Sequence, residues 1–261
     1  MRIASNTMSD VMIRQIQQLT GEQAKLQLQV STGRRITQPE DDPTAVGRVL
    51  TLQSEKRQIG QYASNAIRSL TLAQTSFSGL QGLKKVSDRA GELATLGTGA
   101  MSSDAMNAYA TEVDQMLEQA LQLANSRAGS DYIFAGTAVD APAFSATRDA
   151  NNKITTLTFD GNTSQAVIPL SEATSVSPST SGTTNQGIGD FLNHLVALRD
   201  ALTAGDIDAV RAVQPGLTDD EDMLIAAMAD NGGIQTRIEA AQVQQQDRAT
   251  NIEKLISNET S

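Results

Sequence analysis

The chain has 261 residues, which is enough for one long domain or two modest ones. Apolar residues make up 39% of it and aromatic residues only 3%, so its core must come mainly from aliphatic side chains, as helix seams do. The 20 basic and 30 acidic residues give a net charge of −10, which argues against a nucleic-acid partner and against an anionic membrane surface, because both attract basic proteins.

The first predicted element is a helix from about residue 9 to residue 30. Its apolar positions alternate in steps of three and four residues, which is the spacing of a coiled-coil seam. The seam consists of Met12, Ile16, Leu19, Leu26 and Val30. Because one helix cannot bury its own seam, and an isolated helix of this length is only marginally stable in water, we expect a partner for it.

A polar segment, Val30–Ala45, follows and predicts a hinge between two helices. Gly33 can adopt a positive φ angle and end the first helix. Asp42 is the expected N-cap and Pro43 the first residue of the next helix. We predict that six residues of this hinge act in assembly: Gly33, Arg34, Arg35, Asp41, Asp42 and Pro43. The two arginines could form an anion site, but solvated charges or ion pairs to another subunit are favoured.

A long helix is predicted from Pro43 to about Leu96, because the three- and four-residue steps continue almost without error. About 50 helical residues would extend about 75 Å. Glycines lie inside this segment and weaken a helix. The helix is therefore either supported by its neighbours or broken once near Gly79–Gly82.

A third helix should start after a turn, with Ser102 or Ser103 as its N-cap. We expect it to fold back antiparallel on the second helix and to end at Gly129. Its seam is formed by Met106, Tyr109, Val113, Met116, Ala120 and Leu123.

A β-rich insert is predicted after Tyr132, where aromatic residues become frequent. Ile154–Phe159 alternates with period two and leads into Asp160-Gly161, a hairpin signal, so the return strand is expected at Ala166–Leu170. Residues 171–189 are rich in Ser, Thr and Gly and indicate irregular structure or short strands.

Helices are expected again from about Gly189. The first should end at Gly205, and a short second helix should stop at Pro215-Gly216. Thr218–Glu221 has the pattern of a capping box and predicts the start of a last helix, which keeps the three- and four-residue steps to the end of the chain.

Residues suited to catalysis or metal binding are few. His194 is the single histidine and the chain has no cysteine, so nothing completes a metal site or a nucleophilic pair around it, and it is expected to be a surface or packing residue. The acidic run Asp219–Asp222 lacks the ligand spacing of an EF-hand, and the capping box explains it better. We predict no catalytic residue, no cofactor and no metal, and hence an assembly protein rather than an enzyme.

Three segments together resemble the flagellin superfamily. They are MRIASN at residues 1–6, the hinge, and ANSRAGSDYIFAGT at residues 124–137. The superfamily motif S-S/T-G-x-R-I-x-x-x-x-D-D is matched here by Ser31, Thr32, Gly33, Arg35, Ile36, Asp41 and Asp42. Pro43 and the run Tyr132–Thr137 look more like the hook–filament junction members of the superfamily than like flagellin itself.

The resemblance implies a structural subunit of the bacterial flagellum, in the junction layer between hook and filament. Implied partners are other copies of the chain in a ring layer, hook-associated protein 1, flagellin, and a cytoplasmic export chaperone that binds a C-terminal region. The implied location is extracellular, after type III export without a cleaved signal peptide, and the N-terminus has no apolar core of a secretory signal. Members of the superfamily continue beyond the last helix, so a C-terminally truncated chain is expected.

The alternatives are a flagellin filament subunit and, from a different class, a type III secreted coiled-coil effector or adhesin. The latter would share the seams but has no reason to carry the hinge motif.

The predicted fold is mainly α, a long antiparallel helical bundle like that of flagellins with a small β-rich insert. The expected parts are a tube-lining segment with the hinge at residues 1–42, a discontinuous bundle at residues 43–136 and 189–261, and an outward-facing insert at residues 137–188.

Overall fold

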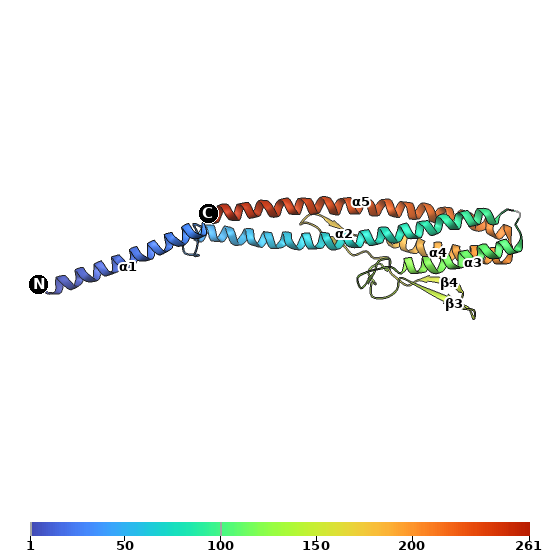
Figure 1. Ribbon diagram of the computed structural model, residues 1–261, viewed down its shortest axis with the longest axis horizontal. Helices are drawn as coiled ribbons and strands as arrows, with labels where there is room; N and C mark the ends of the chain where they lie inside the picture. The colour runs from blue at the N-terminus through green and yellow to red at the C-terminus, as the bar shows by residue number, and fades with distance from the viewer. Residues whose placement is uncertain (1, 100) are drawn as a thin grey trace. The chain divides into compact units, whose positions relative to one another are not determined.

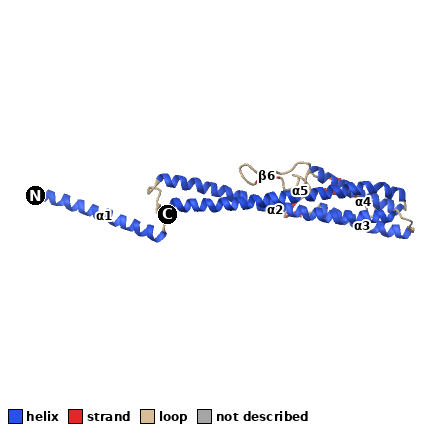
Figure 2. Ribbon diagram, turned by 90° about the horizontal axis from the view of Figure 1, so that it is seen from above, coloured by secondary structure: helices blue, strands red, loops and turns tan. Residues whose placement is uncertain are grey.

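The computed structural model describes residues 2–99 and 101–261, and helices dominate it (Figures 1 and 2). The helices are α1 (Arg2–Thr32), α2 (Pro43–Gly97), α3 (Ser103–Ala124), α4 (Gly182–Ala204) and α5 (Ile207–Thr260). The strands form antiparallel pairs, β1 (Arg127–Ala128) with β2 (Asp131–Tyr132), β3 (Phe144–Arg148) with β4 (Ile154–Phe159), and β5 (Ile168–Pro169) with β6 (Ser175–Val176). The predicted fold class, a helical bundle with a small β-rich insert, is confirmed.

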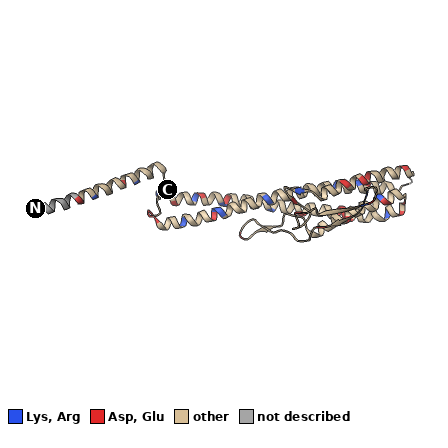
Figure 3. Cartoon of the chain, turned by 90° about the horizontal axis from the view of Figure 1, so that it is seen from below, with Lys and Arg blue, Asp and Glu red and all other residues tan. Residues whose placement is uncertain are grey.

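The chain divides into two compact units, one of residues 1–61 with 245–261 and one of residues 62–244. The three parts suggested by the sequence are defined by their expected places in an assembly, whereas these two units are defined by contacts within the chain. The division into three parts stays a prediction. In both units acidic and basic positions are interspersed along the helices (Figure 3).

The first unit contains α1, the linker after it, the beginning of α2 and the end of α5. The α2 and α5 segments run antiparallel and side by side (Figures 1 and 2). Ile59 and Ile252 are buried there. Ion pairs connect the two helices on the outside, with Lys56 Nζ 2.7 Å from Glu253 Oε1 and an Arg248 nitrogen 2.9 Å from Glu55 Oε1.

In the second unit α2 packs with α3, α4 and the first part of α5 around the main apolar core, and a smaller cluster around Ala66, Ala73 and Ile238 lies beside β5 and β6. Leu80, Leu117, Leu192 and Leu224 are fully buried in the main core. α2 is unbroken, so of the two alternatives the one with support from neighbours is correct. A Cβ at Gly79 would lie 3.0 Å from the Phe134 ring, so this glycine admits a close neighbour and does not break the helix.

α3 begins as predicted but ends earlier than expected. The Ser102 side chain caps it by accepting a hydrogen bond from the Ala105 amide. The prediction that it ends at Gly129 is wrong, because the helix stops at Ala124 and Asn125 turns away to bind the insert. The Asn125 side chain donates to the Phe144 carbonyl at 2.9 Å and accepts from the Phe144 amide at 3.0 Å. Gly129, with φ of +66°, lies in the β1–β2 turn instead.

The strand at Ile154–Phe159 is confirmed, but its predicted partner is wrong. β4 pairs with β3, which precedes it, whereas β5 pairs with β6. The turn between β3 and β4 is built by Asp149, whose Oδ1 accepts the amides of Asn151 and Lys153 at 2.8 Å each, and by Asn152 at a φ of 64°. Asp and Asn favour turns in this way, by hydrogen-bonding to nearby backbone amides and by tolerating a positive φ.

α4 begins at Gly182, before the predicted start at Gly189. Ser181 is its N-cap and accepts a hydrogen bond from the Thr184 amide at 3.0 Å. Gly182 is packed so closely that a Cβ there would lie 2.4 Å from the Thr163 Cα. The end of the helix at Gly205, with φ of 67°, is as predicted.

The predicted interruption of the last helix at Pro215-Gly216 is wrong, because α5 is one continuous helix through Pro215. Thr218 is not a cap residue either, since its Oγ1 donates to the Gln214 carbonyl one turn back at 3.1 Å. Val210 and Leu217 are buried on either side of the proline. Burial of this face against the core offsets the helix-breaking tendency of proline, which is why the local signal fails.

Candidate assembly site

The predicted seam of α1 is exposed to solvent. The exposed fractions are 58% for Met12, 62% for Ile16, 60% for Leu19, 60% for Leu26 and 84% for Val30. A shallow groove of about 350 Å³ runs along the last part of the helix beside Leu26 and Val30. Surface helices normally bury such a stripe, so this apolar face is available for another chain.

Gly33 ends α1 with a φ of +66° and donates its amide to the Gln29 carbonyl at 2.8 Å. The next residue but one, Arg35, turns the linker onto the end of α5. The amides of Arg35 and Ile36 both donate to the Thr260 carbonyl, at 2.7 and 3.4 Å. A guanidinium nitrogen of Arg35 also donates to the Glu259 carbonyl at 3.2 Å. A cation at the C-terminal end of a helix is favourable because the carbonyls there are partly negative.

Asp41 holds the middle of the linker in shape. One carboxylate oxygen accepts the amides of Thr37 and Gln38, each at 2.9 Å, and the other lies 2.5 Å from Lys25 Nζ on α1. The Lys25 ammonium, followed by the Gln38 and Thr37 amides, holds the pKa of Asp41 well below its usual range. The carboxylate thus connects α1 to the linker as long as it is charged.

Asp42 starts the next helix, as the sequence predicts. Its Oδ1 accepts the Ala45 amide at 2.9 Å, and Pro43 is the first residue of α2. The same carboxylate lies 3.5 Å from an Arg35 guanidinium nitrogen. The Ala45 amide lowers the pKa of Asp42, and Arg35 lowers it further. Cap and ion pair together place the two ends of the linker beside each other.

Arg48 and Glu259 join α2 to α5 next to the linker, since Arg35 also donates to the Glu259 carbonyl. Nε and Nη2 of Arg48 donate to the two carboxylate oxygens of Glu259 at 3.0 and 2.8 Å. This two-point geometry raises the pKa of Arg48 and lowers the pKa of Glu259, each mainly through the hydrogen bonds to the other. Both groups therefore stay charged throughout the neutral range.

The structure brings together most of the hinge residues that the sequence singles out. Gly33, Arg35, Asp41, Asp42 and Pro43 all lie in the linker network, and the Arg34 amide approaches Thr32 Oγ1 at 3.4 Å. Sequence reasoning missed the partners Lys25, Arg48 and Glu259. Nothing local marks these three, because each gains its role from a residue distant in sequence. Whether any of the singled-out residues acts in assembly stays a prediction.

His194 is more than an isolated surface residue. Its Nδ1 lies 2.6 Å from Asp220 Oδ2, which connects α4 to α5. Burial raises the pKa of Asp220, and the His194 ring opposes that rise. A Cβ at Gly216 would lie 2.8 Å from the His194 ring, so glycine at this position makes room for the imidazole.

The described residues hold neither a metal cluster nor a membrane-spanning helix. Among them, no group of three or more His, Asp or Glu side chains is arranged to hold a metal ion. No helix within the same residues is long and apolar enough to cross a membrane. The geometry that stands out is therefore the exposed stripe of α1 and the linker that attaches it.

The sequence model of a known family, described as the bacterial flagellin N-terminal helical region, matches residues 3–138, which is just over half of the chain. The chain belongs to this family. Its resemblance to the flagellin superfamily is thereby confirmed, and the family is one of structural flagellar proteins rather than enzymes.

Among curated proteins, the chain is similar to flagellar hook-associated protein 3 of Salmonella typhimurium, with 32% identity over 148 residues. The match covers 55% of this chain and 46% of that protein. The chain thus spans about half the length of the curated relatives it matches.

Solved structures share the fold. A protein from Vibrio parahaemolyticus that is assigned to the flagellar hook-associated proteins superposes with a TM-score of 0.74 at 18% identity, over 85% of this chain and 100% of that one. The flagellar junction protein FlgL from Legionella pneumophila gives a TM-score of 0.59 at 10% identity, over 82% of this chain and 99% of that one. At such low identity these matches establish a common fold.

Proposed function

We propose that this chain is a structural subunit of the bacterial flagellum, placed in the junction layer between hook and filament. The observation that carries the proposal is the apolar stripe of α1, which a lone chain leaves in water. The chain that carries this stripe belongs to the flagellin family, and it is similar to flagellar hook-associated protein 3. An exposed seam of this length is stable in water only when another helix covers it.

The proteins expected to contact this subunit follow from its proposed place in the junction layer. Copies of the same chain cover it sideways, hook-associated protein 1 meets the layer from the hook, and flagellin meets it from the filament. In the cytoplasm an export chaperone is the expected partner, and the working location is outside the cell. The acidic net charge of −10 favours solubility before assembly.

In the same proposal the linker is the joint of the subunit. Residues 1–42 line the tube, and the insert at residues 137–188 faces outward. The linker network of Arg35 and Asp41 holds one arrangement of this joint. Neighbouring subunits then fix α1 in place and change the conformation of the residues between Arg34 and Asp41.

A strain that lacks the gene for this chain tests the function. We expect cells that build hooks, carry no filaments and release filament protein into the medium, because nothing anchors the filament. Full-length filaments in this strain would contradict the proposal. Hooks without filaments, together with a medium free of filament protein, would point to a filament subunit instead.

Complementation with two variants then tests the stripe itself. Leu19→Lys places a charge in the middle of the stripe, and Gln18→Lys places the same charge on the neighbouring position outside the predicted seam. We expect Gln18→Lys to restore swimming and Leu19→Lys to leave filament protein in the medium, although both chains are exported in equal amounts. Equal motility of the two strains would show that the stripe has no partner in the flagellum.

A further inference from the structure

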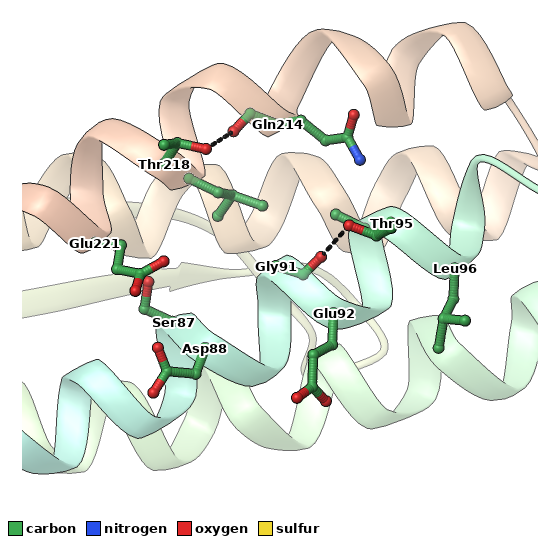
Figure 4. A pocket seen from close by; sticks show the side chains of 11 residues that line it. Ser87, Asp88, Gly91, Glu92, Thr95, Leu96, Gln214, Thr218 and Glu221 are labelled. Atoms are coloured by element: carbon green, nitrogen blue, oxygen red, sulfur yellow. Dashed lines mark hydrogen bonds between the residues drawn. The ribbon is translucent and has the colours of Figure 1, made fainter.

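A groove of about 740 Å³ lies between α2 and α5 in the unit of residues 62–244 (Figure 4). Its α2 side is formed by Ser87, Gly91 and Thr95, which repeat every fourth residue and so lie in one row along the helix. Its α5 side is formed by Gln214, Thr218 and Glu221. A row of small side chains at this interval is a groove into which the ridge of another helix fits.

Gly91 is not explained by packing within the chain. A Cβ at this position would meet nothing within 4 Å, so alanine would fit and would favour the helix more. By contrast, Gly79 and Gly82 of the same helix face side chains at 3.0 Å. The bare backbone at Gly91 therefore leaves room for something outside the chain.

Ser87 is also unsatisfied within the chain. The residue is 2% exposed, and its hydroxyl has no hydrogen-bond partner among the described residues. Figure 4 shows this side chain pointing from α2 toward Glu221 on the other wall. Buried hydroxyl groups are nearly always paired, so this one indicates a missing polar partner.

The rims of the groove carry an excess of negative charge. Lys84 Nζ lies 2.7 Å from Asp88 Oδ1 and 3.4 Å from Glu221 Oε1. Beside them, an Arg89 nitrogen lies 2.8 Å from Glu92 Oε2, and Arg89 Nε lies 2.6 Å from Glu112 Oε1. Four carboxylates thus share two cations, and the three carboxylates that line the groove are between 41% and 62% exposed.

We propose that this groove is an interaction surface for a helix of another protein subunit that presents two basic side chains one turn apart. The backbone of that helix approaches over Gly91. Its lysine or arginine groups pair with the surplus carboxylates at Asp88 and Glu221, and one of their N–H groups donates to the Ser87 hydroxyl. Charge complementarity selects a basic helix over a neutral one.

The test uses the full chain and a synthetic probe. The probe is an alanine-based helical peptide with two arginines four residues apart, and the control peptide has glutamine in their place. We expect the arginine peptide to shift the amide NMR signals of Ser87, Gly91 and Thr95 in a saturable way, and the control peptide to leave them unchanged. Equal shifts from both peptides, or no saturable shift, would overturn the proposal.

Charge-removing variants distinguish binding at the groove from a non-specific response to the net negative charge of the chain. Asp88→Asn with Glu221→Gln should weaken the arginine peptide at least tenfold. Asp131→Asn with Asp208→Asn removes the same charge from two ion-paired aspartates away from the groove and should leave affinity unchanged. Equal weakening by both pairs would mean that the peptide responds only to net charge, and the proposal would fail.

A last variant fills the groove without changing charge. Gly91→Leu should abolish peptide binding and leave the unfolding midpoint at or above that of the parent chain, because the position is open and helical. Gly60→Leu is the matched control in α2, also at an open position. Undiminished binding by Gly91→Leu would overturn the proposal. None of these measurements depends on flagellar assembly, so the function proposed above stands or falls separately.

Discussion

Asp41 is the residue on which the order of the linker depends. Its folded-state pKa lies below the ordinary aspartate value, so its stabilising effect is complete above that ordinary value and is lost as the pH falls toward the lowered one. We expect a carbon NMR titration to show Asp41 still ionised at pH values below the ordinary aspartate pKa, because the Lys25 ammonium and the Gln38 and Thr37 amides favour the carboxylate. Titration of Asp41 at the ordinary aspartate pKa would contradict the hydrogen bonds described here.

Substitution gives a second measurement at this residue. Asp41→Asn removes the charge that faces Lys25 and weakens the acceptor of the Thr37 and Gln38 amides. We expect those two amides to exchange with solvent faster in this variant, and Glu40→Gln, which also removes one negative charge, to leave them unchanged.

Alanine substitutions at two glycines with positive φ distinguish the cost of backbone strain from the cost of a steric collision. Gly129 has φ of +66° and open space around its missing Cβ, whereas at Gly136, with φ of +70°, a Cβ would lie 2.2 Å from the Asn162 carbonyl oxygen. Gly129→Ala should cost about 1–2 kcal/mol for the left-handed backbone alone. Gly136→Ala adds a collision with backbone and should cost about 3 kcal/mol or more. Urea unfolding followed by circular dichroism compares the two, and equal midpoints would refute the packing at Gly136.

Among the elements, α5 contains the clearest conflict between local preference and final structure. Pro215 lies inside the helix, where proline costs about 3 kcal/mol relative to alanine. Pro215→Ala should therefore stabilise the chain, by up to about that amount. Pro142→Ala, in an exposed loop, should instead destabilise it by at most about 1 kcal/mol, since it only loosens the unfolded chain. A loss of stability in Pro215→Ala would mean that the core is fitted to a proline-bent helix.

Several helix boundaries were predictable from local signals. Gly33, Asp42-Pro43 and Gly205 each act on the backbone within one turn, and each ends or begins a helix as the sequence predicts. The strand partner of Ile154–Phe159 was not, because Asp160-Gly161 and the Asp149–Lys153 segment both favour a turn. Contacts with other elements decide between them: the Asn125 side chain donates to the Phe144 carbonyl, and Asn193 on α4 accepts the Leu157 amide. Neither turn segment encodes these contacts.

In the candidate site, too, the residues with local signals were predictable and those with distant partners were not. The α1 stripe and the hinge residues follow from periodicity and from turn chemistry, so the sequence identified them. Lys25, Arg48 and Glu259 complete the linker network across long separations in the chain, and charged residues on helices are too common to single out. Continuity of α5 through Pro215 likewise depends on burial of Val210 and Leu217, which only the folded core supplies.

For the whole molecule, the structure predicts a strong gradient of protection against hydrogen exchange. α1 exposes its apolar stripe, whereas residues 80–94 of α2 pack into the main core. An unsupported helix opens easily, while core helices open only with the unit. We expect amides of residues 10–32 to exchange at least about a hundredfold faster than those of residues 80–94 in the isolated chain. Equal protection of the two sets of amides would show that α1 is already stabilised within the monomer. It would contradict the proposal that α1 becomes fixed only when neighbouring subunits bind.

The contact between Arg35 and the end of α5 also has a mechanical meaning. The covalent chain carries any pull on α1 through Asp42 and Pro43 into α2. The bonds from Arg35 and Ile36 to the Thr260 carbonyl, with the guanidinium on Glu259, pass part of that pull to α5 as well. Two antiparallel helices thus share the load at one junction, and the Arg48–Glu259 pair resists their sliding past each other. A rotating shaft built from such subunits would transmit torque through paired helices instead of single strands of chain.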